Sequence, residues 1–151
     1  MLGYYNNPNA TRAAYTDDGW FRSGDIGLWL DSGEISLVGR ISDMYKSGGY
    51  NIYPREIELL LESHPSVGAS VVVSIPDPIF QEVSIAFIIG KHQQNIDIAE
   101  VTSFCKNHLA NYKLPKKFIN IAQFPMLPIG KVDKIQLKKM GVDSVSSQCF
   151  S

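Results

Sequence analysis

Three short stretches of the chain bring together residue types that could bind a nucleotide or stabilise a negative charge. The first runs from Trp20 to Asp25 and ends in a lone carboxylate beside a glycine. A carboxylate in that position could accept hydrogen bonds from the two vicinal hydroxyls of a ribose, as an acid does in dinucleotide-binding folds. From residue type alone, a solvated turn aspartate is the more common interpretation of Asp25.

The second stretch is the polar segment from Gly39 to Glu58, which contains Lys46, Gly48 and Gly49. Bare backbone N–H groups together with one lysine suit an anion. The GxxxxGK[ST] pattern of a Walker loop is absent, so a phosphate loop of that type is excluded. Considered as a pattern, a loop that joins two domains explains the segment equally well.

The third stretch, Leu127 to Lys134, places Lys131 directly after a glycine and just before an expected helix. A lysine there could reach an anionic centre on its flexible stem and act as a point charge. Most surface lysines have no such role, so residue type alone favours a solvated side chain.

The composition limits the class of protein that could carry these stretches. The chain has 151 residues, of which 44% are apolar and 19% charged, a balance typical of a globular domain. Its 14 basic and 15 acidic residues give a net charge of −1, which provides no basic field for a nucleic acid.

No apolar run approaches the roughly 18 residues of a membrane span, and we expect a cytoplasmic protein. Cys105 and Cys149 are far apart, which indicates neither a zinc site nor a disulfide framework.

Apolar patterns predict the elements that must position the three stretches. Residues 27–30 and 34–38 flank a polar turn with glycine and predict a β-hairpin. Downstream we expect a helix from Pro54 to just before Pro65, buried strands at Val67–Ile75 and Glu82–Gly90, a helix capped by Asp97, a strand at Lys116–Ile121, and a helix from Lys134 to Met140 that Gly141 ends. Glu56 and Glu58 open the first of these helices, where carboxylates favour the helix dipole.

The order of elements predicts an α+β fold, with a small sheet of about three strands covered by helices and preceded by the hairpin. A hairpin alone is marginally stable. We therefore expect residues 1–39 to be the end of a larger upstream domain. The serine-rich tail, residues 142–151, is expected to fray.

Taken in this order, the three stretches resemble the signature motifs of the adenylate-forming superfamily, which comprises AMP-forming acyl-CoA synthetases, adenylation domains and luciferases. Trp20–Asp25 is similar to its YRTGD-type motif, and Gly39–Glu58 to its GRxxDxxKxxGxxxxPxEIE motif. Pro128–Lys134 is similar to the terminal PxGKVDR motif, with Lys134 in place of arginine. The resemblance extends from Gly3 to about Met140.

The resemblance implies an enzyme that forms an acyl-adenylate from ATP and a carboxylic acid and then transfers the acyl group to a thiol. It implies that Asp25 and Arg40 hold the ribose hydroxyls and that Lys131 is the catalytic lysine of adenylation. It further implies a hinge in residues 40–46, at Ser42 and Asp43, followed by a small mobile domain, residues 47–141. Ser42 departs from the aspartate or lysine usual at this position, and Met126 and Leu127 stand where relatives commonly carry a basic residue and a threonine.

In the second half-reaction, the resemblance implies that Gly48 and Gly49 line the tunnel for the pantetheine arm of CoA, with Lys46 in the same loop. Lys113, Lys116 and Lys117 could contact the 3′-phosphate of CoA, although a solvated basic face is the simpler interpretation.

The resemblance also sets the expected cofactors and partners. ATP and Mg²⁺ would be bound mainly by a large N-terminal domain of the same polypeptide, with CoA as cosubstrate and no metal site in this chain. The expected function is thus the C-terminal portion of a carboxylic acid–CoA ligase, acting on a fatty, aryl or similar acid and inactive as an isolated chain. The alternatives are an adenylation domain that loads a carrier protein and a non-catalytic binding module derived from the family.

Overall fold

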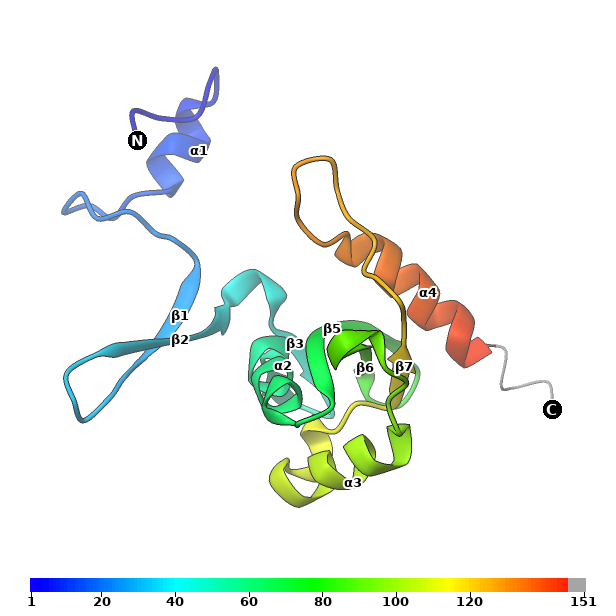
Figure 1. Ribbon diagram of the computed structural model, residues 1–151. Helices are drawn as coiled ribbons and strands as arrows, with labels where there is room; N and C mark the ends of the chain where they lie inside the picture. The colour runs from blue at the N-terminus through cyan, green and yellow to red at the C-terminus, as the bar shows by residue number, and fades with distance from the viewer. Residues whose placement is uncertain (147–151) are drawn as a thin grey trace. The chain divides into compact units, whose positions relative to one another are not determined.

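The computed structural model describes residues 1–146 and divides the chain into two compact units, one from Met1 to Ser42 and one that begins at Asp43 (Figure 1). The division falls inside the segment 40–46 that the sequence analysis assigns to a hinge. Rotation about this segment stays a prediction.

The first unit contains a short helix and a hairpin. The helix α1 (Pro8–Ala13) is capped by Asn7, whose side-chain oxygen accepts a hydrogen bond from Ala10 N at 3.0 Å. Sequence analysis missed this helix, because six residues are too few to show a helical period. Strands β1 (Asp25–Trp29) and β2 (Ile35–Arg40) pair antiparallel and confirm the predicted hairpin.

The hairpin leaves large apolar side chains exposed within its unit. Trp29 is 76% exposed and Leu37 65%. The other exposed apolar residues of this segment are Leu28, Leu30 and Ile35. Such a surface is consistent with the expectation that residues 1–39 end a larger domain, which stays a prediction.

The second unit is built on a five-stranded sheet. Its strands are β3 (Tyr45–Ser47), β4 (Tyr50–Ile52), β5 (Val67–Asp77), β6 (Gln81–Gly90) and β7 (Lys117–Asn120). They lie in the order β4-β3-β6-β5, and β7 pairs in parallel with β6. The α+β class is confirmed, but the expectation of about three strands is wrong. The two extra strands, β3 and β4, form within the segment that reads as a polar loop.

Helices follow the strands at the predicted places. They are α2 (Pro54–Ser63), α3 (Ile98–His108) and α4 (Lys134–Ser146), with short 3-10 turns η1 (Ile41–Asp43), η2 (Lys91–Gln93) and η3 (Asn111–Lys113). The predicted cap of α3 is confirmed, because the Asp97 carboxylate accepts hydrogen bonds from Ala99 N and Glu100 N.

The two central strands are buried on both faces, as their continuous apolar runs predict. On one face, Val72, Ala86 and Ile88 pack in a cluster with residues of α2 and α3. On the other face, Val73, Ile85 and Phe87 pack in a cluster with Leu137 of α4. In Figure 1, α2 and α3 accordingly lie on one side of the sheet and α4 on the other.

The final helix does not end where the sequence predicts. Gly141 was expected to stop it, but α4 continues to Ser146, so residues 142–146 are helical and do not belong to a frayed tail. A Cβ atom at Gly141 would lie 3.2 Å from Ile75 Cγ2 and 3.4 Å from Ile85 Cγ1. The glycine is therefore a packing residue that lets α4 approach the sheet. The rest of the expected tail, residues 147–151 with Cys149, lies outside the described residues.

Glu58 also has a role different from the expected one. Its carboxylate is buried, and it accepts a hydrogen bond from Val72 N at 3.0 Å and pairs with Arg55 at 3.3 Å. It satisfies the outer edge of β5 instead of the amino end of α2. Only Glu56 of the expected pair lies in the first turn of the helix.

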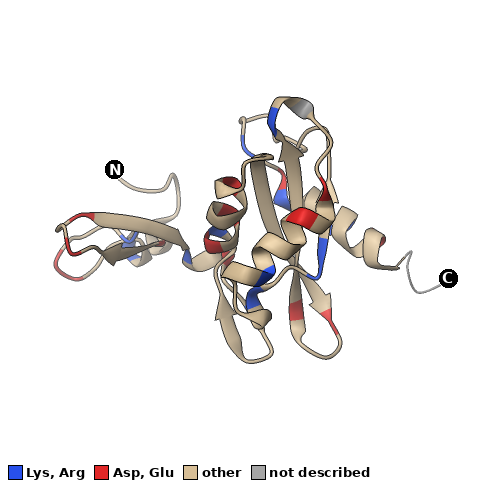
Figure 2. Cartoon of the chain, turned by 60° about the horizontal axis from the view of Figure 1, so that its bottom comes forward, with Lys and Arg blue, Asp and Glu red and all other residues tan. Residues whose placement is uncertain are grey.

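Charges are dispersed over the described residues. Figure 2 shows acidic and basic positions interspersed along the helices and strands, in keeping with the net charge of −1. In residues 1–146, no helix combines the length and the apolar character that crossing a bilayer requires.

The close approach at Gly141 predicts the effect of a larger side chain. Gly141→Leu should lower the free energy of unfolding by about 1–3 kcal/mol, because the new atoms would overlap Ile75 and Ile85. Urea unfolding measures this loss. Val142→Leu, at a 42% exposed position of the same helix, is the control and should change stability little. Equal stabilities of wild type and Gly141→Leu would contradict this packing role.

Candidate functional site

The first group of site residues lies in the hairpin. Asp25 and Arg40 are direct partners across the antiparallel pair, and Arg40 Nε donates to Asp25 Oδ1 at 2.8 Å. Asp25 N in turn donates to Ser23 Oγ at 3.1 Å. The Arg40 side chain is 60% exposed, so the ion pair contributes little to stability. Strand pairing thus brings together the two residues expected to hold a ribose, and both are accessible to a ligand.

The second group is the turn between β3 and β4. Gly48 and Gly49 have φ values of +55° and +86°, as the two central residues of a tight I′-type hairpin turn require. Gly48 N donates to Phe80 O at 3.0 Å, and a Cβ on Gly48 would meet the Phe80 ring at 3.3 Å. No atom lies within 4 Å of a Cβ placed on Gly49. The exposed Lys46 lies on β3, opposite Asn51.

The third group is the turn that carries Lys131. Gly130 N donates to Leu127 O at 2.9 Å and Leu127 N to Lys131 O at 2.7 Å, with Gly130 at φ +77°. These bonds close a compact turn, from which the exposed Lys131 side chain extends. Lys134, the residue that replaces the family's arginine, donates to Asp43 Oδ2 at 2.6 Å. This bond links the start of α4 to the predicted hinge residue Asp43, and Ser42 is the last residue of the first unit.

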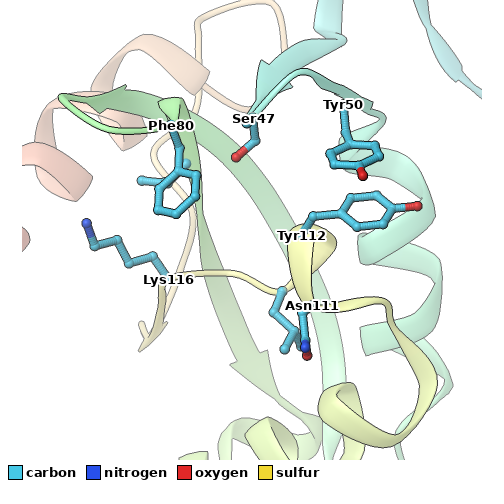
Figure 3. A pocket seen from close by; sticks show the side chains of 9 residues that line it. Ser47, Tyr50, Phe80, Asn111, Tyr112 and Lys116 are labelled. Atoms are coloured by element: carbon cyan, nitrogen blue, oxygen red, sulfur yellow. The ribbon is translucent and has the colours of Figure 1, made fainter.

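A pocket of about 300 Å³ opens beside the glycine turn (Figure 3). The stacked rings of Tyr50 and Tyr112 form one wall, with their centroids 4.2 Å apart, and Phe80 faces them across the pocket. Ser47 lies at the top of this view and Asn111 at the bottom. The remaining lining residues are Gly48, Val83, Leu114 and Lys116. An apolar space with flat aromatic walls and one ammonium group suits a planar ring that carries an anionic substituent.

Asp77 is hydrogen-bonded to two of the residues that line this pocket. Its Oδ2 accepts a hydrogen bond from Lys116 Nζ at 2.6 Å, and its Oδ1 accepts from Ile79 N at 2.9 Å and Phe80 N at 3.0 Å. The bond from Lys116, followed by those from the two amides, lowers the pKa of Asp77 to about 2. The carboxylate therefore stays ionised at every physiological pH.

Sequence analysis found some of these residues and missed others. It named Lys116 as a candidate phosphate contact, and the structure places Lys116 at the pocket but Lys117 elsewhere, donating to Ser144 O at 2.6 Å. It missed Phe80, Tyr112 and Asp77. Asp77 and Phe80 come from the turn between β5 and β6 and Tyr112 from η3, and only the tertiary fold brings these two segments together, so no local spacing could reveal the pocket. The dipeptide Pro76-Asp77 before a proline was the one available signal of a structured turn.

Two other groups that could be reactive, the thiol of Cys105 and the hydroxyl of Tyr45, are buried in the core. Burial raises the pKa of the Cys105 thiol to about 11, which makes it a poor nucleophile. Burial also raises the pKa of Tyr45 to about 12. Within residues 1–146, no three His, Cys, Asp or Glu side chains form a cluster that could hold a metal ion.

The lowered pKa of Asp77 predicts how stability responds to acid. The folded pKa of about 2 lies below the unfolded value near 3.9, so the ionised carboxylate contributes stability above pH 4 that is lost as the pH falls toward 2. The difference in unfolding free energy between wild type and Asp77→Asn should be constant from pH 7 to 5 and should shrink from pH 4 to 3. Urea unfolding at each pH measures it. A difference that grows below pH 4 would contradict the assignment.

Comparison with known proteins relates this geometry to a family. The family described as AMP-binding enzyme C-terminal domain matches residues 56–131. A sulfoacetate–CoA ligase from Cupriavidus necator is 39% identical over 137 residues, which are 91% of this chain and 27% of the relative. A long-chain-fatty-acid–CoA ligase from Mycobacterium tuberculosis is 40% identical over 136 residues, 90% of this chain and 27% of the relative. The chain thus spans about a quarter of the length of these curated relatives.

Solved structures similar to this chain also come from adenylate-forming enzymes. ATP-bound MatB from Rhodopseudomonas palustris is similar with a TM-score of 0.79 and 34% identity, over 91% of this chain and 27% of its own. The amide bond synthetase McbA from Marinactinospora thermotolerans is similar with a TM-score of 0.84 and 30% identity, over 93% and 28%. The match to these enzymes is to their C-terminal part. The chain therefore belongs to the AMP-binding enzyme C-terminal domain family, the small domain of adenylate-forming enzymes.

Proposed function

We propose that this chain is the C-terminal portion of an ATP-dependent carboxylic acid–CoA ligase. In the first half-reaction, the acid attacks the α-phosphate of ATP and releases pyrophosphate; in the second, the thiol of CoA attacks the acyl-adenylate and releases AMP. The observation that carries the proposal is that one domain contains two features. These are an exposed lysine on a glycine turn and a second glycine turn beside an aromatic pocket. The curated relatives named as CoA ligases support the choice of thiol.

Asp25 and Arg40 are assigned to the ribose of the nucleotide. Their side chains meet at 2.8 Å across the hairpin, and both are accessible, so a carboxylate oxygen can accept from the ribose hydroxyls while the guanidinium donates. Strand pairing fixes the spacing of the two groups before any ligand arrives.

Lys131 is assigned to adenylation. Its ammonium group would offset the negative charge that develops between the carboxylate and the α-phosphate. The closed turn from Leu127 to Gly130 holds the base of this side chain, while its exposed stem gives the ammonium reach. The Mg²⁺ that accompanies ATP is assigned to the large N-terminal domain of the same polypeptide, as the resemblance to the family implies.

The glycine turn and the pocket are assigned to CoA. The open space over Gly49 would admit the pantetheine arm, with Lys46 on the strand that leads into the turn. The aromatic walls of the pocket would accept the adenine ring, and Lys116 would face a phosphate. Ser42 and Asp43 would form the pivot that presents Lys131 and then the glycine turn. The reaction would take place in the cytoplasm.

The function is tested with the full-length polypeptide that carries this chain. It is incubated with ATP, Mg²⁺, CoA and a mixture of fatty and aryl acids, and acyl-CoA is detected by mass spectrometry, with the 151-residue chain alone as control. Thioester from the full-length protein and none from the chain alone supports the proposal. AMP release without a CoA thioester would favour the loading of a carrier protein, and the absence of turnover would favour a non-catalytic module.

Removal of the Lys131 charge should impair the first half-reaction. Lys131→Ala in the full-length protein should slow ATP–pyrophosphate exchange by about a hundredfold to a thousandfold, the loss typical of one preorganised electrostatic group of about 3–4 kcal/mol. Lys106→Ala, at an exposed position of α3, is the matched control and should exchange normally. Comparable exchange by Lys131→Ala and wild type would refute the assignment.

A side chain at Gly49 should impair only the second half-reaction. Gly49→Leu should slow thioester formation by about tenfold or more, because leucine would fill the space assigned to the thiol arm and strain the +86° backbone. Pyrophosphate exchange should stay within about twofold. Gly33→Leu introduces the same residue at φ +84° in the hairpin turn and controls for backbone strain. Equal loss of both half-reactions in Gly49→Leu would contradict the assignment.

A further inference from the structure

Asp77 forms contacts that a simple turn does not require. Its side chain is only 4% exposed, although it is a carboxylate at the end of β5. Oδ1 accepts from the amides of Ile79 and Phe80, which is an ordinary aspartate turn, but Oδ2 accepts from Lys116 Nζ at 2.6 Å. The two oxygens thus bind two segments that lie 39 positions apart in the sequence.

A second aspartate shows what the turn alone would need. Asp97 also accepts hydrogen bonds from two backbone amides, those of Ala99 and Glu100, and caps α3. In the described contacts, its carboxylate binds no lysine. Capping of a turn therefore explains one oxygen of Asp77, and the bond to Lys116 needs a separate explanation.

Two of the three partners of Asp77 are walls of the aromatic pocket. Phe80 and Lys116 line it directly. The carbonyl of Phe80 also accepts from Gly48 N at 3.0 Å, so the turn held by Asp77 is bonded to the glycine turn. The next residue, Gln81, has φ +70° and pairs with Ser47, which is the one paired position recorded between β6 and β3 in the described residues.

We propose that Asp77 is a positioning residue that holds Lys116, the Phe80 turn and, through the Phe80 carbonyl, the Gly48 amide in one arrangement, so that the pocket and the glycine turn form as a unit. Loss of the carboxylate frees the Phe80 ring and the ammonium group together. The glycine turn then loses the acceptor that ties it to the long strands. Because Ser47–Gln81 is the one pair recorded between β3 and β6 in the described residues, the bond from Gly48 N to Phe80 O adds a second link between the glycine turn and the long strands.

The first test measures backbone protection and needs no ligand. Amide hydrogen exchange of the 151-residue chain is followed by NMR in wild type, Asp77→Ala and Asp97→Ala. In Asp77→Ala, exchange at Gly48 should quicken by about tenfold or more, as loss of one buried hydrogen-bonded link implies. Asp97→Ala removes an equivalent pair of amide bonds and should leave Gly48 unchanged. Unchanged Gly48 exchange in Asp77→Ala, or equal quickening in Asp97→Ala, overturns the proposal.

A second variant keeps the proposal testable if Asp77→Ala does not fold. Asp77→Asn retains an oxygen for the amides of Ile79 and Phe80 but presents no charge to Lys116. NMR relaxation of the Lys116 side chain should show increased motion in Asp77→Asn, with Gly48 exchange close to that of wild type. A Lys116 side chain that is as ordered in Asp77→Asn as in wild type overturns the proposal.

The consequence for ligand binding rests on the proposed function. CoA is titrated into wild type, Asp77→Ala and Asp97→Ala, and the NMR chemical shifts of the pocket residues are followed to obtain the dissociation constant of CoA. Asp77→Ala should weaken CoA binding by about tenfold or more, and Asp97→Ala by no more than about twofold. Equal CoA affinity of wild type and Asp77→Ala overturns the positioning role. If CoA shifts no pocket residue even in wild type, the assignment of the pocket to CoA fails, and the exchange measurements still decide the role of Asp77.

Discussion

The second unit depends on the pairing of β5 with β6, two long antiparallel strands that are buried on both faces. Because side chains alternate along each strand, neighbouring residues such as Val72 and Val73 serve opposite clusters. One cluster binds α2 and α3, and the other binds α4. A one-residue slip of register would exchange the two sets, so burial on both faces fixes the register. The loops at the ends of these strands acquire defined positions in consequence.

The turn between β5 and β6 shows how this rigid pair serves the site. It carries Asp77 and Phe80 at the end of the ladder, where the sheet no longer satisfies every backbone amide. The carboxylate satisfies two of those amides and binds Lys116 from the segment that leads into β7. Since β7 pairs in parallel with β6, the lysine reaches this turn only after the chain has crossed over through α3. Topology, rather than local sequence, thus creates the pocket.

Local sequence patterns were sufficient to predict the helices and strands that begin at a capping residue or a proline or that consist of a continuous apolar run. Proline at the start of α2 and the side chain of Asp97 before α3 mark the helix starts that the structure shows, and runs of valine and isoleucine mark β5 and β6. Gly141 was misjudged because a glycine near the end of a helical pattern can either stop a helix or permit close packing. Only the distance to Ile75 and Ile85 separates these two roles. The short strands β3 and β4 were missed because their stability comes from pairing and from the turn at Gly48 and Gly49.

The candidate site residues were predictable to a different extent. Asp25, Arg40, Lys46 and Lys131 were named from motifs, and the structure shows all but Asp25 to be exposed and Asp25 to be half-buried. Exposed charges contribute little to stability, so their placement is not explained by folding. Asp77 and Gly141 are the reverse, because each is buried and each fixes the position of a neighbouring element. Neither role can be recognised from local spacing, because the partners of Asp77 and Gly141 lie in segments distant in the sequence, and only the tertiary structure shows which buried residues connect those segments.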